Sequence, residues 1–346
     1  DIAEPTGKTV AIIGSGPAGL TAASDMIQKG HDVTVFEALH KPGGVLFYGI
    51  PQFRLPKEIL VREISGLEDM GVKFVMNYPV GKAESLDSIR ERFDVVFIAT
   101  GAGLPWFLGI PGENLNGVYS ANEFLTRVNL MGGYKFPEGA DTPVKNIKRI
   151  AVVGAGNTAM DSARTAKRLQ PEVVYLVYRR SRLEMPARIE EIHHAEEEGI
   201  DFQLLHSPIE IVDDGTGAVG AIRCQEMELG EPDASGRRRP VPIEGKVKEW
   251  AVDTVVLSIG QSPNPLLTAD CPDLARDERK GTITTNLETM RTSREGVLAG
   301  GDIAIGAATV ILAMGHGRQA ARSKNHYLET GQWDIEALPE QVGSEA

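Results

Sequence analysis

Two glycine-rich turns, each directly after an apolar strand, constrain this chain more than any other feature. The first, Gly14-Ser15-Gly16-Pro17-Ala18-Gly19, follows a strand predicted over Thr9–Ile13, and the second, Gly154-Ala155-Gly156-Asn157-Thr158-Ala159, follows one over Arg149–Val153. In such a turn the first glycine permits the bend into a helix, the second lets the backbone approach a pyrophosphate, and the third position keeps helix and strand close. The N–H groups at the start of the helix then face the phosphates. The chain is therefore predicted to hold two dinucleotides.

The residue at the end of the next strand distinguishes the two turns. It is Glu37 after the first turn and the pair Arg179 and Arg180 after the second. A carboxylate accepts hydrogen bonds from an adenosine ribose, whereas a guanidinium accommodates a 2′-phosphate. We interpret the first turn as an FAD or NAD site and the second as an NADP(H) site; the alternative is that both arginines are merely solvated. Two different cofactors on one chain indicate electron transfer between them.

Size and charge narrow the functional class. The 346 residues, 42% of them hydrophobic, suit two domains. A formal net charge of −12 argues against non-specific binding to nucleic acid or to an anionic membrane. The segment 296–315 is almost free of charge, but its glycines and Asp302 predict a strand, a loop and a helix starting near Ala308 rather than a membrane span.

Cysteine usage excludes several chemistries. The chain has only Cys224 and Cys271 and no C-x-x-C motif, so it lacks the dithiol of a thioredoxin-reductase-like enzyme and any ligand set for an iron–sulfur cluster or a zinc ion. No metal site is therefore expected. Few cysteines and no signal peptide favour the cytoplasm. Because the chain begins at Asp1 rather than Met, loss of an N-terminal part stays open.

The order of predicted elements indicates an α/β fold with two doubly wound parallel sheets, in which ligands bind at the carboxyl ends of the strands. Three segments are expected to form antiparallel strands: 202–205, 209–212 and 219–227. Residues 283–285 and 297–299 should complete the first sheet. The second domain is therefore expected to be inserted into the first, with an FAD-binding domain over 1–117 and 268–346 and an NADPH-binding domain over 118–267.

Several longer strings resemble known families. Together with the paired turns, the strand end at Thr100-Gly101 and the late Gly301-Asp302 resemble the two-dinucleotide-binding flavoproteins. A narrower resemblance, to the small subunit of NADPH-dependent glutamate synthase, is carried by Tyr48-Gly49-Ile50-Pro51, Tyr178-Arg179-Arg180-Ser181, Glu184-Met185-Pro186-Ala187 and Gly306-Ala307-Ala308-Thr309. The string over 110–122 and the highly charged helix predicted over 187–198 most closely resemble the large subunit of the NADH-dependent ferredoxin:NADP oxidoreductase.

This resemblance implies a role for each site residue. FAD would lie on the first turn, with Glu37 on its ribose and Asp302 on its ribityl chain. NADP(H) would lie on the second turn, with the two arginines on the 2′-phosphate. The turn through Gly44, Val45 and Leu46 would lead toward the flavin, and Ala308 and Thr309 would face the N1/O2 side of its ring. Gly260 would lie beside the nicotinamide.

The resemblance also implies an activity, which is hydride transfer between NADPH and FAD followed by electron delivery to a partner subunit or domain. The cofactors carry this chemistry, so no catalytic side chain is expected. Members of the group usually have an N-terminal domain with iron–sulfur clusters, which this chain lacks; it is either an excised module or uses another acceptor. The alternatives are a non-catalytic nucleotide-binding redox scaffold and, less favoured, a disulfide-reductase-like flavoenzyme.

Overall fold

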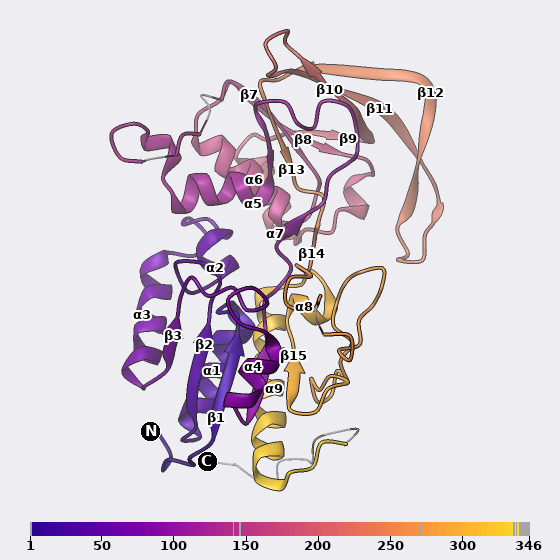
Figure 1. Cartoon of the computed structure of the whole chain (residues 1–346). Helices are drawn as coiled ribbons and strands as arrows, with labels where there is room; N and C mark the ends of the chain where they lie inside the picture. The colour runs from indigo at the N-terminus through magenta and orange to yellow at the C-terminus, as the bar shows by residue number, and fades with distance from the viewer. Residues whose placement is uncertain are drawn as a thin grey trace. The chain divides into compact units, whose positions relative to one another are not determined.

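The computed structural model describes residues 2–140, 142–144, 147–269, 271–334, 336 and 338. Asp1 and residues 339–346, which the first predicted domain includes, lie outside the described residues. The chain divides into two compact units: unit 1 comprises 1–47, 55–104 and 261–346, and unit 2 comprises 48–54 and 105–260 (Figure 1). These borders differ from the expected ones after 117 and 267, and the short segment 48–54 belongs to unit 2.

Unit 1 is built on a five-stranded sheet in the order β15-β4-β1-β2-β3. All neighbouring strands are parallel: β1 (Thr9–Ile13), β2 (Asp32–Phe36), β3 (Lys73–Val75), β4 (Val95–Ile98) and β15 (Val297–Ala299). Side chains alternate across it, so Val10 and Ile12 enter one core cluster while Ala11 and Ile13 enter another. Both faces are therefore buried, as the apolar composition of the strands requires.

Unit 1 also contains helices, several of which pack against this sheet. They are α1 (Pro17–Gln28), α2 (Val45–Tyr48), α3 (Lys57–Asp69), α4 (Leu86–Arg92), α8 (Asp302–Ile305) and α9 (Val310–Thr330). Helices α1 and α9 pack closely because Gly317 has no side chain: a Cβ atom there would lie 2.4 Å from the Ala18 carbonyl oxygen. The prediction of a strand, a loop and a helix over 296–315 is confirmed by β15, α8 and α9. No helix among the described residues is long and apolar enough to cross a membrane.

Unit 2 contains a second five-stranded parallel sheet in the order β6-β13-β7-β8-β9. Its strands are β6 (Val118–Ser120), β7 (Arg149–Val153), β8 (Val173–Tyr178), β9 (Asp201–Leu204) and β13 (Thr254–Leu257). Its helices are α5 (Ala121–Leu125), α6 (Asn157–Arg168) and α7 (Ile189–Glu197), with the π-helical turn Thr126–Leu130 and the 3-10 turns Gly133–Lys135 and Arg182–Glu184. The predicted α/β class with two parallel sheets is confirmed.

An antiparallel sheet extends from the same unit. It consists of β10 (His206–Asp213), β11 (Val219–Pro232) and β12 (Arg238–Ala251), and Figure 1 shows the long ribbon of β11 and β12 beside the parallel sheet. Two short segments, β5 (Leu104–Pro105) and β14 (Gln261–Ser262), form a two-stranded ladder where the chain passes between the units.

Two strand predictions are wrong. Residues 202–205 were expected to be antiparallel, but β9 runs parallel to β8 because α7 connects the two strands as a crossover. Residues 283–285 form no strand; Ile283 makes only an isolated bridge with Arg276, and β15 alone adds the last strand to the sheet of unit 1. Periodicity identifies extended segments but not their partners.

Candidate functional site

The first glycine turn forms an open cradle at the carboxyl end of β1. Gly14 has a φ of 105°, and a Cβ atom there would lie 2.4 Å from the Ala99 carbonyl oxygen. A Cβ atom at Gly19 would lie 2.0 Å from the Gly14 carbonyl oxygen, whereas one at Gly16 would meet no atom within 4 Å. Gly14 and Gly19 are therefore required by the protein's own packing, whereas Gly16 borders free space. Helix α1 begins there without a side-chain cap, so the cradle fits a pyrophosphate.

Glu37 lies directly after β2 and is buried at this cradle. Its Oε2 accepts hydrogen bonds from the Ser15 backbone N–H (2.9 Å) and hydroxyl (2.5 Å), and its Oε1 accepts one from the Leu39 N–H (2.9 Å). A carboxylate offers about four acceptor sites, so this one retains capacity for a ribose hydroxyl. Glu37 therefore lies beside the first glycine turn with acceptor capacity left for a further donor.

Ser15 is a site residue that the sequence analysis missed. Its hydroxyl donates to Glu37 and accepts a hydrogen bond from the Gly43 N–H (3.0 Å), which joins the first turn to the second glycine turn. A Cβ atom at Gly44, whose φ is 52°, would lie 3.0 Å from the Gly16 Cα atom. No sequence signal identifies Ser15, because any residue can occupy the second position of the fingerprint.

The remaining residues predicted for the flavin end lie in unit 1. Val45 and Leu46 belong to α2, where Val45 is exposed and the Leu46 carbonyl accepts a hydrogen bond from the Lys57 ammonium (2.6 Å). Thr100 and Gly101 follow β4, which pairs with β1. The segment that follows β4 and the glycine turn that follows β1 therefore lie at the same edge of the sheet, where ligands of doubly wound folds bind.

Asp302 is the first residue of α8, and its carboxylate has few hydrogen-bond donors around it. Its Oδ1 accepts a hydrogen bond from the Ala308 N–H (3.2 Å), the only one it receives among the described residues, and burial raises its pKa to about 6. A polyol hydroxyl would supply the missing donors, so the site fits a ribityl chain. The Ala308 N–H is engaged by Asp302 rather than open to a ring, and Thr309 caps α9 by accepting from the Leu312 N–H (3.3 Å).

Gly301 and His316 hold this turn in place. Gly301 has a φ of 75°, and a Cβ atom there would lie 3.2 Å from the Ala18 Cβ. Its N–H donates to His316 Nδ1 (3.1 Å), and burial lowers the pKa of His316. The sequence analysis missed His316, since its role depends on a contact between residues 15 positions apart.

The second cradle repeats this design in unit 2. Gly154 has a φ of 127°, and a Cβ atom there would lie 2.2 Å from the Ser258 carbonyl oxygen. At Gly156 the nearest atom to a Cβ would be 4.0 Å away, in Pro186. Ala159 takes the third position, where its methyl group is fully buried. The space beside the second glycine is therefore open in this cradle too.

The first turn of α6 is tied to its surroundings. The Asn157 side chain accepts a hydrogen bond from the Arg188 N–H (2.9 Å), and the Thr158 carbonyl accepts one from the Ser162 hydroxyl (2.8 Å). Asp161, one turn further on, receives two hydrogen bonds from Arg54 (2.7 and 2.8 Å) and is buried, which raises its pKa to about 6. Arg54 and Asp161, which the sequence analysis missed, therefore anchor the segment 48–54 to the helix that follows the cradle.

The two predicted arginines differ in environment. Both follow β8, whose neighbour β7 leads into the cradle. Arg179 is exposed and has no ion pair or hydrogen bond of its side chain with any residue that the structure describes. Arg180 is 5% exposed and its guanidinium lies 2.6 Å from the Asp233 carboxylate. The structure therefore brings both to the expected strand end but leaves only Arg179 open.

Gly260, which follows β13 and has a φ of 125°, is covered on one side by an aromatic ring. A Cβ atom there would lie 3.6 Å from the Trp106 ring, and the Gly260 carbonyl accepts a hydrogen bond from the Trp106 N–H (3.1 Å). The predicted passage for a nicotinamide beside Gly260 is therefore bordered by Trp106.

The cysteines offer no redox chemistry of their own. Cys224 and Cys271 are both buried and lie in different units. Burial raises the pKa of the Cys224 thiol to about 12, which suppresses the reactive thiolate. With no other cysteine in the sequence, a disulfide-reducing dithiol is absent from this chain.

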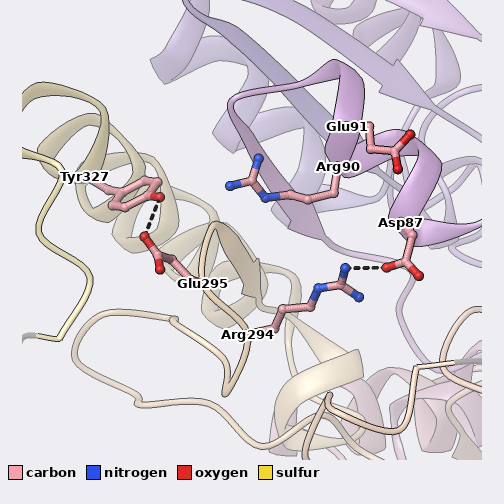
Figure 2. A pocket seen from close by; sticks show the side chains of 6 residues that line it. All are labelled: Asp87, Arg90, Glu91, Arg294, Glu295 and Tyr327. Carbon is pink, nitrogen blue, oxygen red and sulfur yellow. Dashed lines mark hydrogen bonds and ion pairs between the residues drawn. The ribbon is translucent and has the colours of Figure 1, made fainter.

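A charged pocket in unit 1 is separate from these cradles (Figure 2). It lies near the amino ends of β4 and β15, opposite the edge that carries the glycine turn. Its charges are mostly paired: Arg294 contacts Asp87 and Asp273, and the Tyr327 hydroxyl donates to Glu295 (2.9 Å). None of its lining residues is among those predicted for the nucleotide sites.

Comparison with known proteins agrees with this architecture. Residues 8–321 match the model of the pyridine nucleotide-disulphide oxidoreductase family. The beta subunit of the NADP(+)-dependent formate dehydrogenase of Moorella thermoacetica is 41% identical over 98% of this chain, which covers 47% of that subunit. A putative glutamate synthase [NADPH] small chain of Cereibacter sphaeroides is 41% identical over 93% of this chain, which covers 77% of that protein.

Among solved structures, FprA of Mycobacterium tuberculosis in complex with NADPH has a TM-score of 0.77 at 22% identity, covering 96% of this chain and 87% of FprA. This likeness concerns the fold alone. The chain spans about half the length of the formate dehydrogenase subunit. On the family model and the glutamate synthase relative, the chain is an oxidoreductase that belongs to the pyridine nucleotide-disulphide oxidoreductase family, in the group that contains the glutamate synthase small chains.

Proposed function

We propose that this chain is an NADPH-dependent flavoprotein module, in which unit 1 binds FAD, unit 2 binds NADPH, and electrons leave to a partner subunit or domain. When bound, the two cofactors supply the hydride chemistry, and the protein supplies position and charge. The observation that carries the proposal is the contrast between the cradles. Each has open space beside its second glycine, but one ends at a held carboxylate and the other at an exposed arginine.

The residues of unit 1 would bind and orient. Glu37, held in place by Ser15, would accept a hydrogen bond from a ribose hydroxyl. Asp302 would accept one from a hydroxyl of the ribityl chain, which would supply a donor to this buried carboxylate. Gly16 would let the pyrophosphate reach the start of α1, where the positive end of the helix dipole favours anions. No side chain of this site is required to move a proton.

The residues of unit 2 would select the reductant. Gly156 and the start of α6 would hold its pyrophosphate, and Arg179 would pair with its 2′-phosphate. A charge-assisted hydrogen bond contributes about 1.5 to 3 kcal/mol, so this arginine alone accounts for a preference of roughly ten- to a hundredfold.

The proposal of an electron-accepting partner rests on the relatives and on cysteine usage. Both curated relatives are named as a subunit or small chain of a larger enzyme. The two cysteines of this sequence do not make up the ligand set of an iron–sulfur cluster. We expect the acceptor to be an iron–sulfur centre in another domain or subunit. Two cysteines in 346 residues make the cytoplasm the expected compartment.

The test compares nucleotides on the flavin-loaded protein. Arg179→Leu should raise the KM for NADPH by about ten- to a hundredfold and leave that for NADH nearly unchanged, measured by reduction of an artificial dye. Arg149→Leu, an exposed arginine at the opposite end of β7, is the matched control. Equal effects of Arg179→Leu on both nucleotides, or a protein that retains no flavin, would contradict the proposal.

A further inference from the structure

The turn between β11 and β12 reaches the proposed 2′-phosphate site. This turn, residues 233–237, is closed by two backbone hydrogen bonds: the Asp233 N–H donates to the Arg237 carbonyl (2.8 Å) and the Gly236 N–H to the Asp233 carbonyl (2.9 Å). Asp233 Oδ2 lies 2.6 Å from the Arg180 guanidinium, although 53 residues separate them in the sequence. The hairpin is thus fastened to the end of β8.

Asp233 is held in an ionised state that suits this ion pair. Its Oδ1 accepts hydrogen bonds from the Ser235 N–H (2.8 Å) and hydroxyl, and these bonds, together with Arg180, lower its pKa to about 2. Arg237 also faces the turn, where its Nε donates to the Ser235 hydroxyl (3.0 Å). At neutral pH the turn therefore presents a full negative charge to Arg180.

Arg180 itself is built as a buried anion-binding group that is only partly used. Its side chain is 6% exposed, and its Nε has no hydrogen-bond partner among the described residues. The backbone around it is fixed, because its carbonyl accepts from the Leu205 N–H (3.2 Å). A guanidinium has five N–H donors, so an incoming phosphate could occupy those that Asp233 leaves unused.

A phosphate and Asp233 cannot share this guanidinium without cost. A 2′-phosphate carries nearly two negative charges, and a carboxylate in contact with the same arginine would repel it in a partly buried setting. Either the turn moves away or the phosphate binds Arg179 alone. Both outcomes weaken binding of the phosphorylated nucleotide relative to a site with two available arginines.

We propose that Asp233 is an internal competitor for the 2′-phosphate, so that the β11–β12 hairpin sets the affinity for NADP(H) by releasing or retaining Arg180. This inference rests on the proposed function, since it assigns the 2′-phosphate to Arg179 and Arg180. It adds a specificity-determining residue from the hairpin, and it links nucleotide binding to movement of that hairpin.

The test is a titration of the purified, flavin-loaded chain with NADP⁺ and NAD⁺ by calorimetry. Asp233→Asn keeps a side-chain acceptor for Ser235 but removes the charge, and it should tighten NADP⁺ binding by about tenfold without changing NAD⁺ binding. Glu231→Gln is the matched control, because Glu231 lies in the same hairpin, is exposed, and has no ion pair with any described residue. It should alter neither affinity by more than about twofold.

A second measurement follows the hairpin directly. If NADP⁺ displaces Asp233, amide hydrogen exchange over residues 233–237 should accelerate when NADP⁺ binds and stay unchanged with NAD⁺. Unchanged or weaker NADP⁺ binding by Asp233→Asn, together with a loss of NADP⁺ affinity in Arg179→Leu, would overturn this inference and leave the proposed function intact. If Arg179→Leu weakened NADP⁺ and NAD⁺ equally, the proposed function would fail and this inference with it.

Discussion

The two units share a parallel sheet and a glycine turn, but the buried charged groups beside their proposed nucleotide sites differ in their partners. In unit 1 Asp302 accepts one hydrogen bond from the described residues, and the Nζ of the fully buried Lys324 donates none to them. In unit 2 the buried acid Asp161 is paired with Arg54, and the buried Arg180 is paired with Asp233. The carboxylate at the proposed flavin site therefore keeps capacity for hydrogen bonds from a ligand, whereas the buried arginine at the proposed 2′-phosphate site already has an ionic partner.

This difference matches two kinds of ligand. A site with an undersatisfied buried carboxylate gains stability when a ligand supplies hydroxyl donors, which suits a cofactor that stays bound. At a site whose arginine already has an ionic partner, the ligand must replace that partner, which suits a nucleotide that binds and dissociates repeatedly. The comparison thus favours a resident FAD in unit 1 and an exchanging NADPH in unit 2.

The largest expected effect tests the isolated lysine of unit 1. Lys324 lies in the core with its Nζ 5.0 Å from the centre of the Phe97 ring, and burial lowers its pKa from 10.5 to about 7, opposed by attraction to Asp25. The folded chain therefore loses this proton near pH 7 and the unfolded chain only near 10.5, so stability rises with pH between these values. Below pH 7 the folded chain carries the full free-energy cost of a buried ammonium.

Lys324→Met should consequently raise the free energy of unfolding by about 5 kcal/mol at pH 6 and by less as the pH approaches 10. Urea denaturation at both pH values measures the difference. Lys82→Met, at an exposed lysine, should change stability by less than about 0.5 kcal/mol at either pH. A gain at Lys324 that did not depend on pH would show that the lysine is not buried as a charge.

The next effect tests how tightly the first cradle is closed. Gly19→Ala places a Cβ atom 2.0 Å from the Gly14 carbonyl oxygen, so α1 must move away from the turn. We expect a loss of about 3 kcal/mol in unfolding free energy and release of flavin, measured by urea denaturation and by absorbance of the purified protein.

The equivalent position of the second cradle provides the control. Ala159→Gly removes a buried methyl group from α6 and should cost about 1 kcal/mol, with flavin retained. A loss at Gly19 no larger than that at Ala159 would show that the first cradle tolerates a methyl group at its third position, as the second cradle does.

The smallest effect concerns Asp302, whose pKa is raised from 3.8 to about 6 by burial. The folded chain binds this proton more tightly than the unfolded chain, so in the absence of FAD stability falls as pH rises from about 4 to 6 and stays lower above that range. After flavin removal, Asp302→Asn should therefore be more stable than the wild type by about 2 kcal/mol at pH 7.5. FAD should stabilise the wild type more than the variant; equal stabilisation would separate Asp302 from the flavin site.

Much of the fold was predictable because its signals are local. A strand, a glycine turn and a helix occupy fewer than thirty consecutive residues, and both cradles appear where the fingerprints stand. The strand-end residues Glu37 and Arg179 were equally predictable, because the length of a βαβ unit fixes their position. The direction of β9 was not, since the same alternation suits a parallel or an antiparallel edge.

The sequence by itself determined two nucleotide folds and the sign of charge at each strand end, because backbone conformation and side-chain charge are properties of short segments. Only the tertiary structure decided which charges are available. The pairing of Arg180 with Asp233, and the isolation of Lys324, depend on residues far apart in the chain that folding brings together or keeps apart. A pattern along the chain records which groups exist, and their energies depend on the partners and the water that surround them in the folded protein.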